Sequence, residues 1–380
     1  MAAFDVIIAG VGAAGSAAAC HLARRGARVL ALDRHSIPND RSSHSGTTRI
    51  IRQAYFEHPD YVPLLLRAYE HWRQLEITSR QPLMFLPGML YSGPRDGPLV
   101  QGCLAASRRQ SLNVETLDSG DAMAMFPGFS LPPDHGVLFE PAGGYVLADA
   151  AIRTHASQAA AHGAILSECE PLLQWGASRT SVWVQTPKAR YEAGALVLAT
   201  GAWMSQVSRL SIKLTATLQT LVWTEPRQPS AFASPKAPVW AISDDDGSMY
   251  YGFPSGAGGP GLKAARHHPG VEFDPEMSER PVPQGDIAQV MRFLGRRLPG
   301  ACGPVTRTAA CIYTSTVDQH FVLDRHPDHS RVIVSSACSG HGFKFAPVIG
   351  EAIADLCLGD RSPLPIEFLS LSRFGETGAT

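Results

Sequence analysis

The sequence predicts an α/β fold in which a nucleotide-binding domain is interrupted by a sheet-rich α+β domain. Three observations lead to this expectation. Residues 4–34 follow the order strand, glycine turn, helix and strand. Eight prolines then divide residues 80–143 into short alternating segments, which is typical of sheet and loop. Regular helices and strands return at residues 147–199 and again from about residue 305.

The first unit has the features of a βαβ arrangement. Asp5–Ala9 is a short apolar run rich in β-branched residues, as expected of a strand buried on both faces. Gly15–Arg25 contains small helix-permissive residues and is followed by Gly26 at the C′ position. Val29–Leu32 is a second strand, and Asp33 follows it directly. Together these features predict a Rossmann-type unit.

The remaining elements follow from the same criteria. Tyr61–Glu76 carries its apolar residues on one helical face. Residues 147–163 form an alanine-rich helix, with Asp149 as its candidate N-cap. We expect strands at 164–167, 181–185, 195–199, 218–224, 249–253 and 332–335, a Gly/Pro-rich loop after 253, and helices at 286–298 and 347–357.

These elements divide the chain into two discontinuous domains. Residues 1–80, 145–215 and 305–380 are expected to form the nucleotide-binding domain. Residues 81–144 and 216–304 are expected to form a substrate domain, inserted twice into the first.

The composition excludes several classes of protein. The chain has 380 residues, 44% hydrophobic and 18% charged, which suffices for a large core. Its net charge of −1 gives no basic footprint for nucleic acid or an anionic membrane surface. No apolar run reaches the roughly 18 residues of a transmembrane helix. Seven cysteines without CxxC or CxxxC spacing favour a reducing cytoplasm and argue against a disulfide framework or a metal site.

The glycine turn predicts a bound dinucleotide. Gly10, Gly12 and Gly15 form a GxGxxG motif between strand and helix. They permit the tight turn, the close approach of backbone to a pyrophosphate, and helix–strand packing, respectively. Asp33 is placed to accept hydrogen bonds from the adenosine ribose, and its charge disfavours the 2′-phosphate of NADP. Asp33 leaves NAD and FAD as alternatives.

A second nucleotide contact favours FAD. Residues 195–202, which include Thr200 and Gly201, resemble the corresponding strand and turn of FAD enzymes in the glutathione-reductase-like superfamily. This resemblance implies a glutathione-reductase-like FAD-binding domain.

Several later blocks resemble one particular family. Their order and spacing cover almost the whole chain, with the poorest matches at 95–135 and 225–248. The blocks are Ser43–Tyr55, Tyr61–Arg67, Tyr250–Ser255 with Gly261–Lys263, Cys311–Thr314 with Asp318 and Asp324, and Ser339–Lys344. They resemble the monomeric sarcosine oxidase and N-methyltryptophan oxidase family.

The resemblance implies a reaction. Members of that family are FAD enzymes that oxidise the C–N bond of a secondary amino acid, N-methyl or cyclic. A hydride equivalent passes to the flavin, the imine product hydrolyses, and O2 reoxidises the flavin to give H2O2. The expected partners are therefore a small amino acid and O2, and the expected state is a cytoplasmic monomer.

The resemblance also implies roles for individual residues. Cys311 matches the cysteine joined to the flavin 8α-methyl group as a thioether, and Lys263 matches the lysine thought to activate O2. Arg52 and Lys344 match the pair that binds the substrate carboxylate. Arg49 is expected against the flavin. The substrate cavity is expected to be lined by Tyr55, Tyr251, His267 and Tyr313, and further FAD contacts are expected from Arg34, Ser43, His44, Thr48, Gly342 and Phe343.

Two positions depart from the family pattern. The family commonly has a histidine four residues before the equivalent of Arg49, whereas this chain has Ser45 there and His44 one place earlier. Where sarcosine oxidase has a bulky residue closing the pocket, this chain has either Ala241 or Ile242. A larger cavity would favour a substrate bigger than sarcosine.

Three other functions remain open at this stage. A tailoring oxidase would desaturate a ring precursor in secondary metabolism. A flavin-carrying sensor would bind without turnover, although Lys263 and the carboxylate pair argue against it. An NAD-dependent dehydrogenase would share the glycine motif and Asp33.

Overall fold

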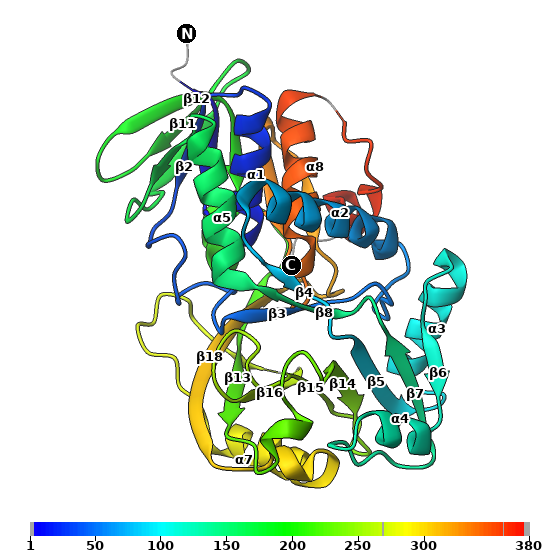
Figure 1. Cartoon of the computed structure of the whole chain (residues 1–380). Helices are drawn as coiled ribbons and strands as arrows, with labels where there is room; N and C mark the ends of the chain where they lie inside the picture. Colours follow the sequence, from blue (N-terminus) through cyan, green and yellow to red (C-terminus); the bar gives the residue numbers. More distant parts are fainter. Residues whose placement is uncertain (1–3, 268–269, 360, 376–380) are drawn as a thin grey trace.

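The computed structural model describes residues 4–267, 270–359 and 361–375 and contains two large sheets, one above the other in Figure 1. The eight-stranded sheet has the order β10-β11-β12-β1-β2-β9, with β20 beside β12 and β19 beside β20. Its strands are β1 (Phe4–Ala9), β2 (Val29–Leu32), β9 (Ile165–Ser167), β10 (Gln174–Ala177), β11 (Val182–Gln185), β12 (Arg190–Leu198), β19 (Val322–His326) and β20 (His329–Ser336).

The predicted βαβ unit lies at the centre of this sheet. Strand β1 is parallel to both β2 and β12, with Val6 opposite Val29 and Ala195. The last four residues of β1 are buried, as its apolar run predicts. Helix α1 (Ala13–Arg24) begins two residues before the predicted start and ends before Gly26, whose φ of +84° confirms the predicted C′ position.

Three helices cover one face of this sheet: α1, α5 (Ala148–Ala161) and α8 (Ala346–Leu358). Helix α2 (Tyr61–Ser79) packs on α5 and α8. Small residues let them approach closely, since a Cβ on Gly350 would lie 2.6 Å from the backbone of Ala17. The N-cap prediction for Asp149 is wrong: Leu147 is the N-cap and Asp149 lies in the first turn of α5. A carboxylate in the first turn still complements the helix dipole.

The second large sheet has the order β17-β13-β16-β15-β14-β5-β7-β6, with β18 paired to β13. Helix α7 (Gln284–Arg297) packs on it, and the ring of Phe293 stacks on Trp240 and Tyr250. The strands are β5 (Met89–Pro94), β6 (Glu115–Leu117), β7 (His135–Glu140), β13 (Thr215–Thr224), β14 (Val239–Ser243), β15 (Met249–Phe253), β16 (Leu262–His267), β17 (Val271–Glu272) and β18 (Val305–Ser315).

Two expectations for these regions were incomplete. The segment 80–143 also contains helices α3 (Pro98–Gln110) and α4 (Ser119–Met125). Pro98 occupies the first turn of α3, where a proline needs no N–H partner. The loop expected after residue 253 contains β16, because its backbone pairs with β13 and β15.

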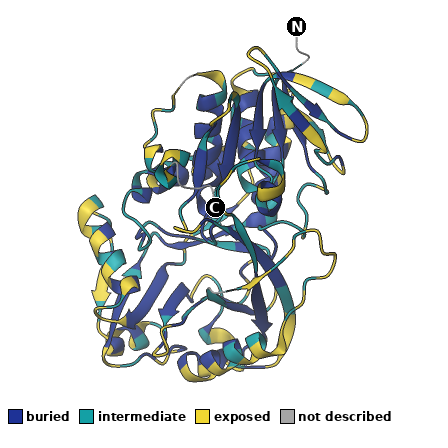
Figure 2. Ribbon diagram, turned by 180° about the vertical axis from the view of Figure 1, so that it is seen from behind, coloured by how far each residue is buried: buried dark blue, intermediate teal, exposed yellow. Residues whose placement is uncertain are grey.

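A three-stranded sheet lies between the larger two (Figure 1). It consists of β3 (Thr48–Ile51), β8 (Gly144–Leu147) and β4 (Met84–Phe85). Figure 2 shows buried strands inside the molecule and exposed residues along α3 and α7. The short helices are η1 (Gly201–Trp203), α6 (Met204–Val207), η2 (Pro229–Ala231), η3 (Pro299–Ala301), η4 (Phe343–Phe345), η5 (Glu367–Leu369) and η6 (Leu371–Phe374).

The predicted domain boundaries stay a prediction. They assign residues 305–315 to the nucleotide-binding domain, and these residues form β18 of the nine-stranded sheet. Within the described ranges, none of the helices has the length and apolar character needed to cross a membrane.

Candidate active site

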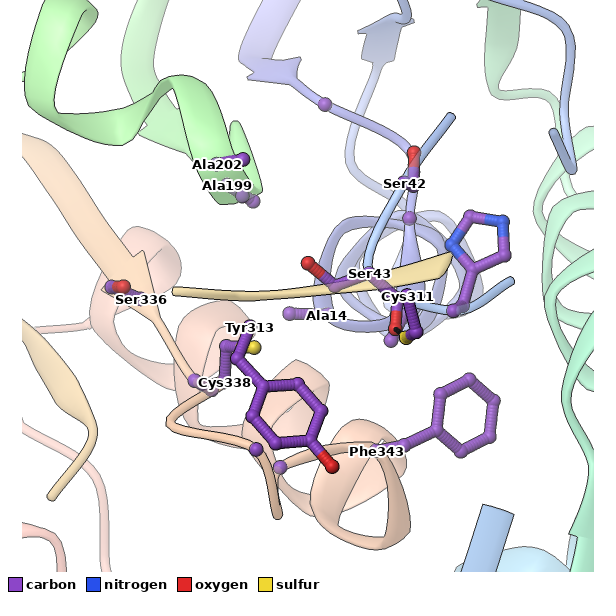
Figure 3. A pocket seen from close by; sticks show the side chains of 18 of the residues that line it. Ala14, Ser42, Ser43, Ala199, Ala202, Cys311, Tyr313, Ser336, Cys338 and Phe343 are labelled. Atoms are coloured by element: carbon purple, nitrogen blue, oxygen red, sulfur yellow. Dashed lines mark hydrogen bonds between the residues drawn. The ribbon is translucent and has the colours of Figure 1, made fainter. Parts of the chain in front are cut away.

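A cavity of about 500 Å³ receives side chains from both large sheets. Figure 3 shows Cys311, Tyr313 and Phe343 around the same space as Ala14 and Ala199, which flank the nucleotide turn. Most of the residues predicted from sequence lie in its wall. They are Gly10, Gly12, Asp33, Arg34, Ser43, His44, Thr48, Arg49, Arg52, Thr200, Gly201, Tyr251, His267, Cys311, Tyr313, Gly342, Phe343 and Lys344.

The glycine turn forms one end of the cavity. Gly10 has a φ of +94°, and a Cβ there would lie 2.4 Å from the carbonyl oxygen of Ala199. A Cβ on Gly15 would lie 1.8 Å from the carbonyl oxygen of Gly10, so this glycine serves helix–strand packing behind the wall. Gly12 faces open space, with His44 Nδ1 3.8 Å from a Cβ placed there.

The turn fits the pyrophosphate and ribose of a dinucleotide. The N-cap of α1 is Gly12, which offers no side-chain cap, and the helix N-terminus borders the cavity at Ala13 and Ala14. The Asp33 carboxylate accepts hydrogen bonds from the backbone N–H of Val11 and of His35, both at 2.8 Å. Burial raises the pKa of Asp33, although these two bonds oppose the shift.

Unpartnered polar atoms in the wall also fit a bound cofactor. His35 Nε2 and Ser335 Oγ are buried and have no hydrogen-bond partner within the described part of the chain. Buried polar atoms in folded proteins nearly always have a partner. A polar ligand that fills this cavity would supply one.

A cation and a thiol meet at the middle of the cavity. Arg49 Nη2 donates to Cys311 Sγ at 3.1 Å and to the carbonyl oxygens of Ser43 and Ser45. Cys311 lies on β18 and is 2% exposed. Arg49 comes from β3, so the pairing of β3 with β8 fixes its side chain opposite the sulfur.

Arg52 and Lys344, the two cations predicted to bind the substrate carboxylate, line the same cavity. Glu57, an acidic residue that the sequence did not reveal, lies there with them. Arg52 donates to both oxygens of Glu57, at 2.6 and 2.7 Å, and to the carbonyl oxygen of Ala54 at 2.8 Å. Lys344 Nζ donates to the carbonyl oxygen of His341 at 2.6 Å. Burial, together with the charge of Arg52, lowers the pKa of Lys344 to about 7. Glu57 lies two residues beyond the block Ser43–Tyr55, and its position five residues after Arg52 was the available signal.

Lys263 lies behind the cavity wall, on β16. Its Nζ donates to the carbonyl oxygens of Gly46 (2.8 Å) and Thr48 (2.9 Å) and to Thr48 Oγ1. It also lies 3.9 Å from the centre of the Phe253 ring. Burial and the nearby charge of Arg49 lower the pKa of Lys263 well below its ordinary value. Thr48 separates the lysine from the cavity.

Three of the four predicted cavity residues form one cluster. The Tyr313 hydroxyl lies 3.4 Å from the Tyr251 hydroxyl and 3.4 Å from His267 Nδ1. Tyr55 was expected there too, and this expectation is wrong. Its side chain is fully buried outside the wall, and its hydroxyl faces His341 Nδ1. His341 Nε2 faces the carbonyl oxygen of Gln319 at 2.9 Å, so Nδ1 is the acceptor for Tyr55.

The structure shows where the side chains at the two positions that depart from the family pattern lie. His44 lies in the cavity wall, where burial lowers its pKa to about 3. Ser45 Oγ is buried without a partner among the described residues. Ala241 lines the cavity, whereas Ile242 packs in the core on the other side of β14. The small side chain therefore faces the cavity.

An ion pair also lies in the cavity wall. Arg34 pairs with Glu276, at 2.9 and 3.2 Å, and both line the cavity near Asp33. Glu276 was not foreseen, because it comes from a loop distant in sequence.

Over the residues that the structure describes, no group of three or more His, Cys, Asp or Glu side chains could hold a metal ion.

Comparisons with known proteins agree with this geometry. Residues 5–356 match the family model "FAD dependent oxidoreductase". The chain is 38% identical to monomeric sarcosine oxidase of Streptomyces avermitilis, over 96% of each chain. It is 32% identical to N-methyl-L-tryptophan oxidase of Salmonella arizonae, over 98% of this chain and 100% of that protein.

A solved structure extends the comparison to the fold. The Tyr258Phe mutant of NikD, described as an unusual amino acid oxidase essential for nikkomycin biosynthesis, has a TM-score of 0.85 and 26% identity, over 97% of this chain and 96% of that chain. The family decides between FAD and NAD in favour of FAD and confirms the predicted fold class. The chain therefore belongs to the FAD-dependent oxidoreductase family, in the group that contains monomeric sarcosine oxidase and N-methyl-L-tryptophan oxidase.

Proposed function

We propose that this enzyme oxidises the C–N bond of a secondary amino acid, N-methyl or cyclic, and passes the electrons to O2. The observation that carries the proposal is that Arg52 and Lys344 share one cavity with the glycine turn and Cys311. A cavity that joins a dinucleotide cradle to two cations suits an amino acid whose carboxylate is held while its amine end meets the cofactor.

The cofactor would be held along the length of the cavity. The turn at Gly10 and Gly12 would hold the pyrophosphate, and Asp33 the ribose. The segment that contains Gly342, Phe343 and Lys344 would hold the flavin ring through its backbone. FAD supplies a two-electron acceptor that O2 reoxidises to give H2O2.

Arg52 and Lys344 would bind the substrate carboxylate. The arginine fork matches a carboxylate in two hydrogen bonds, and the lysine adds a point charge. Glu57 neutralises Arg52 in the present arrangement, so a substrate carboxylate must share or replace this partner. Although burial opposes it, the charge of Arg52 lowers the pKa of Glu57, which therefore stays ionised at neutral pH.

The amine end would lie against Tyr251, His267 and Tyr313. Tyrosine and histidine rings suit an N-alkyl group, and their polar atoms are placed to hold the amine nitrogen. Ala241 widens this end of the cavity, which favours a substrate larger than sarcosine.

Cys311 and Lys263 would serve the cofactor. Cys311 is the proposed site of an 8α-S-cysteinyl bond, and the guanidinium of Arg49 next to the sulfur supports this role. Lys263 is the proposed cation for O2 reduction, since a fixed positive charge in a buried site stabilises a developing oxygen anion. Seven unpaired cysteines, all within the described residues, support a cytoplasmic location, and a monomer remains our proposal for the oligomeric state.

Product analysis tests the proposal against its alternative. For an N-methyl amino acid we expect one H2O2 and one formaldehyde for each primary amino acid formed. The alternative is a tailoring oxidase, favoured by the likeness to NikD. It would release no formaldehyde from N-methyl amino acids and would act only on a ring precursor, whose product keeps the ring and loses two hydrogens in mass. If neither product forms with sarcosine, N-methyl aromatic amino acids, proline or pipecolate, the substrate class is wrong, and a flavin-carrying sensor becomes the better interpretation.

A further inference from the structure

A buried carboxylate outside the cavity wall holds the segment that carries Arg52. Glu140 is the last residue of β7 and is 1% exposed. It belongs to the nine-stranded sheet, whereas Arg52 directly follows β3 of the small sheet. Hydrogen bonds between Glu140 and the residues after Arg52 therefore join two sheets at the end of the cavity where the substrate carboxylate would bind.

Within the described residues, every hydrogen-bond partner of the Glu140 carboxylate is a donor. Its Oε1 accepts from the backbone N–H of Gln53 at 2.6 Å, and its Oε2 accepts from that of Ala54 at 3.2 Å. The Tyr91 hydroxyl, fully buried on β5, donates to Oε2 at 2.6 Å. Burial raises the pKa of Glu140, and these three bonds oppose the shift.

The segment 53–56 also fixes the position of the Arg52 guanidinium. Ala54, whose N–H is held by Glu140, accepts from Arg52 Nη1 through its carbonyl oxygen at 2.8 Å. The guanidinium carbon lies 4.3 Å from the ring centre of Tyr55 and 4.4 Å from that of Phe56. A shift of this backbone would thus move both the hydrogen-bond acceptor and the rings that enclose the guanidinium.

We propose that Glu140 is a positioning residue for the substrate carboxylate, acting through the backbone of Gln53 and Ala54 on the guanidinium of Arg52. This inference rests on the proposed function, because it assumes that Arg52 binds a carboxylate. Glu57 and His341 hold other atoms of the segment, the guanidinium itself and the Tyr55 hydroxyl. Glu140 holds two successive backbone N–H groups of the segment, and Cys103 Sγ lies 3.6 Å from the carbonyl oxygen of Ala54.

The test uses two substrates that differ only in the carboxylate, N-methyl-L-phenylalanine and N-methylphenethylamine. Their ratio of kcat/KM in the flavin-loaded enzyme measures the preference for a carboxylate. In Glu140→Gln an amide NH2 replaces one acceptor and faces a donor, so we expect this preference to fall about tenfold, mainly through KM. The rate with the amine should stay within about threefold of wild type, because the amine makes no use of Arg52.

Two variants separate positioning from general stability. Glu170 is also 1% exposed and outside the cavity wall, and it accepts from the hydroxyls of Ser167, Thr186 and Tyr191, none of which belongs to the segment that carries Arg52. Glu170→Gln should keep the carboxylate preference within about twofold of wild type. Tyr91→Phe removes one of the three bonds to Glu140 and should lower the preference by about two- to threefold. It decides the question if Glu140→Gln does not fold.

The outcomes are distinct. A wild-type enzyme without preference for the carboxylate would remove the proposed function and this inference with it. A wild-type preference that Glu140→Gln and Tyr91→Phe both retain would overturn the inference alone. Equal losses with both substrates would show that Glu140 stabilises the fold without positioning Arg52.

Discussion

At the scale of single residues, we propose separate tasks for two buried lysines, Lys263 and Lys344. Lys263 donates to backbone and side chain around Thr48, whereas Lys344 lies in the cavity wall next to Arg52. Replacing Lys263 by Met should slow reoxidation of the reduced flavin by O2 about 10²- to 10³-fold, because the fixed charge is lost. Anaerobic reduction by substrate should change little. Stopped-flow measurement of the two half-reactions checks this.

Lys344→Met is the matched control. It removes a second buried cationic side chain, one that lines the cavity, and it should weaken substrate binding while leaving the O2 reaction close to wild type. Slow reoxidation in Lys344→Met with normal reoxidation in Lys263→Met would reverse the two assignments.

Cys311 gives a prediction with a visible result. Cys311→Ser keeps the size of the side chain but cannot form a thioether, so all flavin should appear in the supernatant after acid precipitation. In the wild type the colour should stay with the precipitate. Cys338→Ser is the control, since its thiol also lines the cavity. Wild-type flavin released by acid would contradict covalent attachment.

These residues also show how far the sequence leads at this scale. The motif blocks assigned Cys311, Arg49, Arg52 and Lys344 to one site, and all four line the same cavity in the structure. They did not show which side chains line the cavity and which lie behind its wall. Lys263 lies behind Thr48, and the Tyr55 hydroxyl is hydrogen-bonded to His341. Which way a side chain points depends on strand pairing and on distant acceptors, which no local pattern contains.

At the scale of elements, two glycines of the turn should respond differently to the same substitution. Gly12→Ala adds a Cβ into open cavity space, so the fold should persist while the flavin content of the purified protein falls by on the order of tenfold. Gly10→Ala puts a Cβ 2.4 Å from the carbonyl oxygen of Ala199 at a φ of +94°. It should destabilise the protein by roughly 1–3 kcal/mol. Flavin content and urea midpoints measure both effects; full flavin in Gly12→Ala would contradict this account of the turn.

The helical layer should be sensitive to acid through a buried histidine of α5. His155 is 3% exposed and contacts the ring of Trp72. Burial lowers the pKa of His155 from 6.5 to about 3, so the folded protein keeps it neutral while the unfolded chain takes up a proton below pH 6.5. Stability is therefore lost as pH falls below 6.5, by about 1.4 kcal/mol at a pH of about 5.5.

Two variants test this sign. His155→Phe should lose about 1.4 kcal/mol less than wild type between a pH of about 7.5 and 5.5, measured by urea unfolding. His162→Phe, on an exposed residue just after the same helix, should keep the wild-type dependence. An unchanged dependence in His155→Phe would show that the histidine is not the group responsible.

Elements with a strong local pattern were predicted well, and those defined by pairing were not. Strand β15 has the predicted bounds, and α2 and α8 differ from prediction by a few residues at most. Strand β16 was missed because glycines and prolines precede it and its pairing partners β13 and β15 decide its conformation. Helix α3 was missed because Pro98 was taken as an interruption instead of a helix start.

At the scale of the whole molecule, function depends on a cavity that no single sheet makes. The nucleotide turn and Asp33 belong to the eight-stranded sheet, Cys311 and Tyr251 to the nine-stranded sheet, and Arg49 to the small sheet between them. The sequence indicated the parts of each sheet. How the sheets meet follows from packing between residues far apart in the chain, which is also why Glu276 and Glu140 were not foreseen.

The central claim is that a secondary amino acid, held by its carboxylate, reduces the flavin of this enzyme. Its most direct test is anaerobic mixing of the purified yellow protein with N-methyl amino acids and with proline, while the visible flavin absorption is followed. We expect full bleaching by at least one of them and, in Arg52→Gln, a limiting rate reached only at much higher substrate concentration. A wild-type flavin that stays oxidised with all of them, yet is bleached by an amine without a carboxylate, would contradict it.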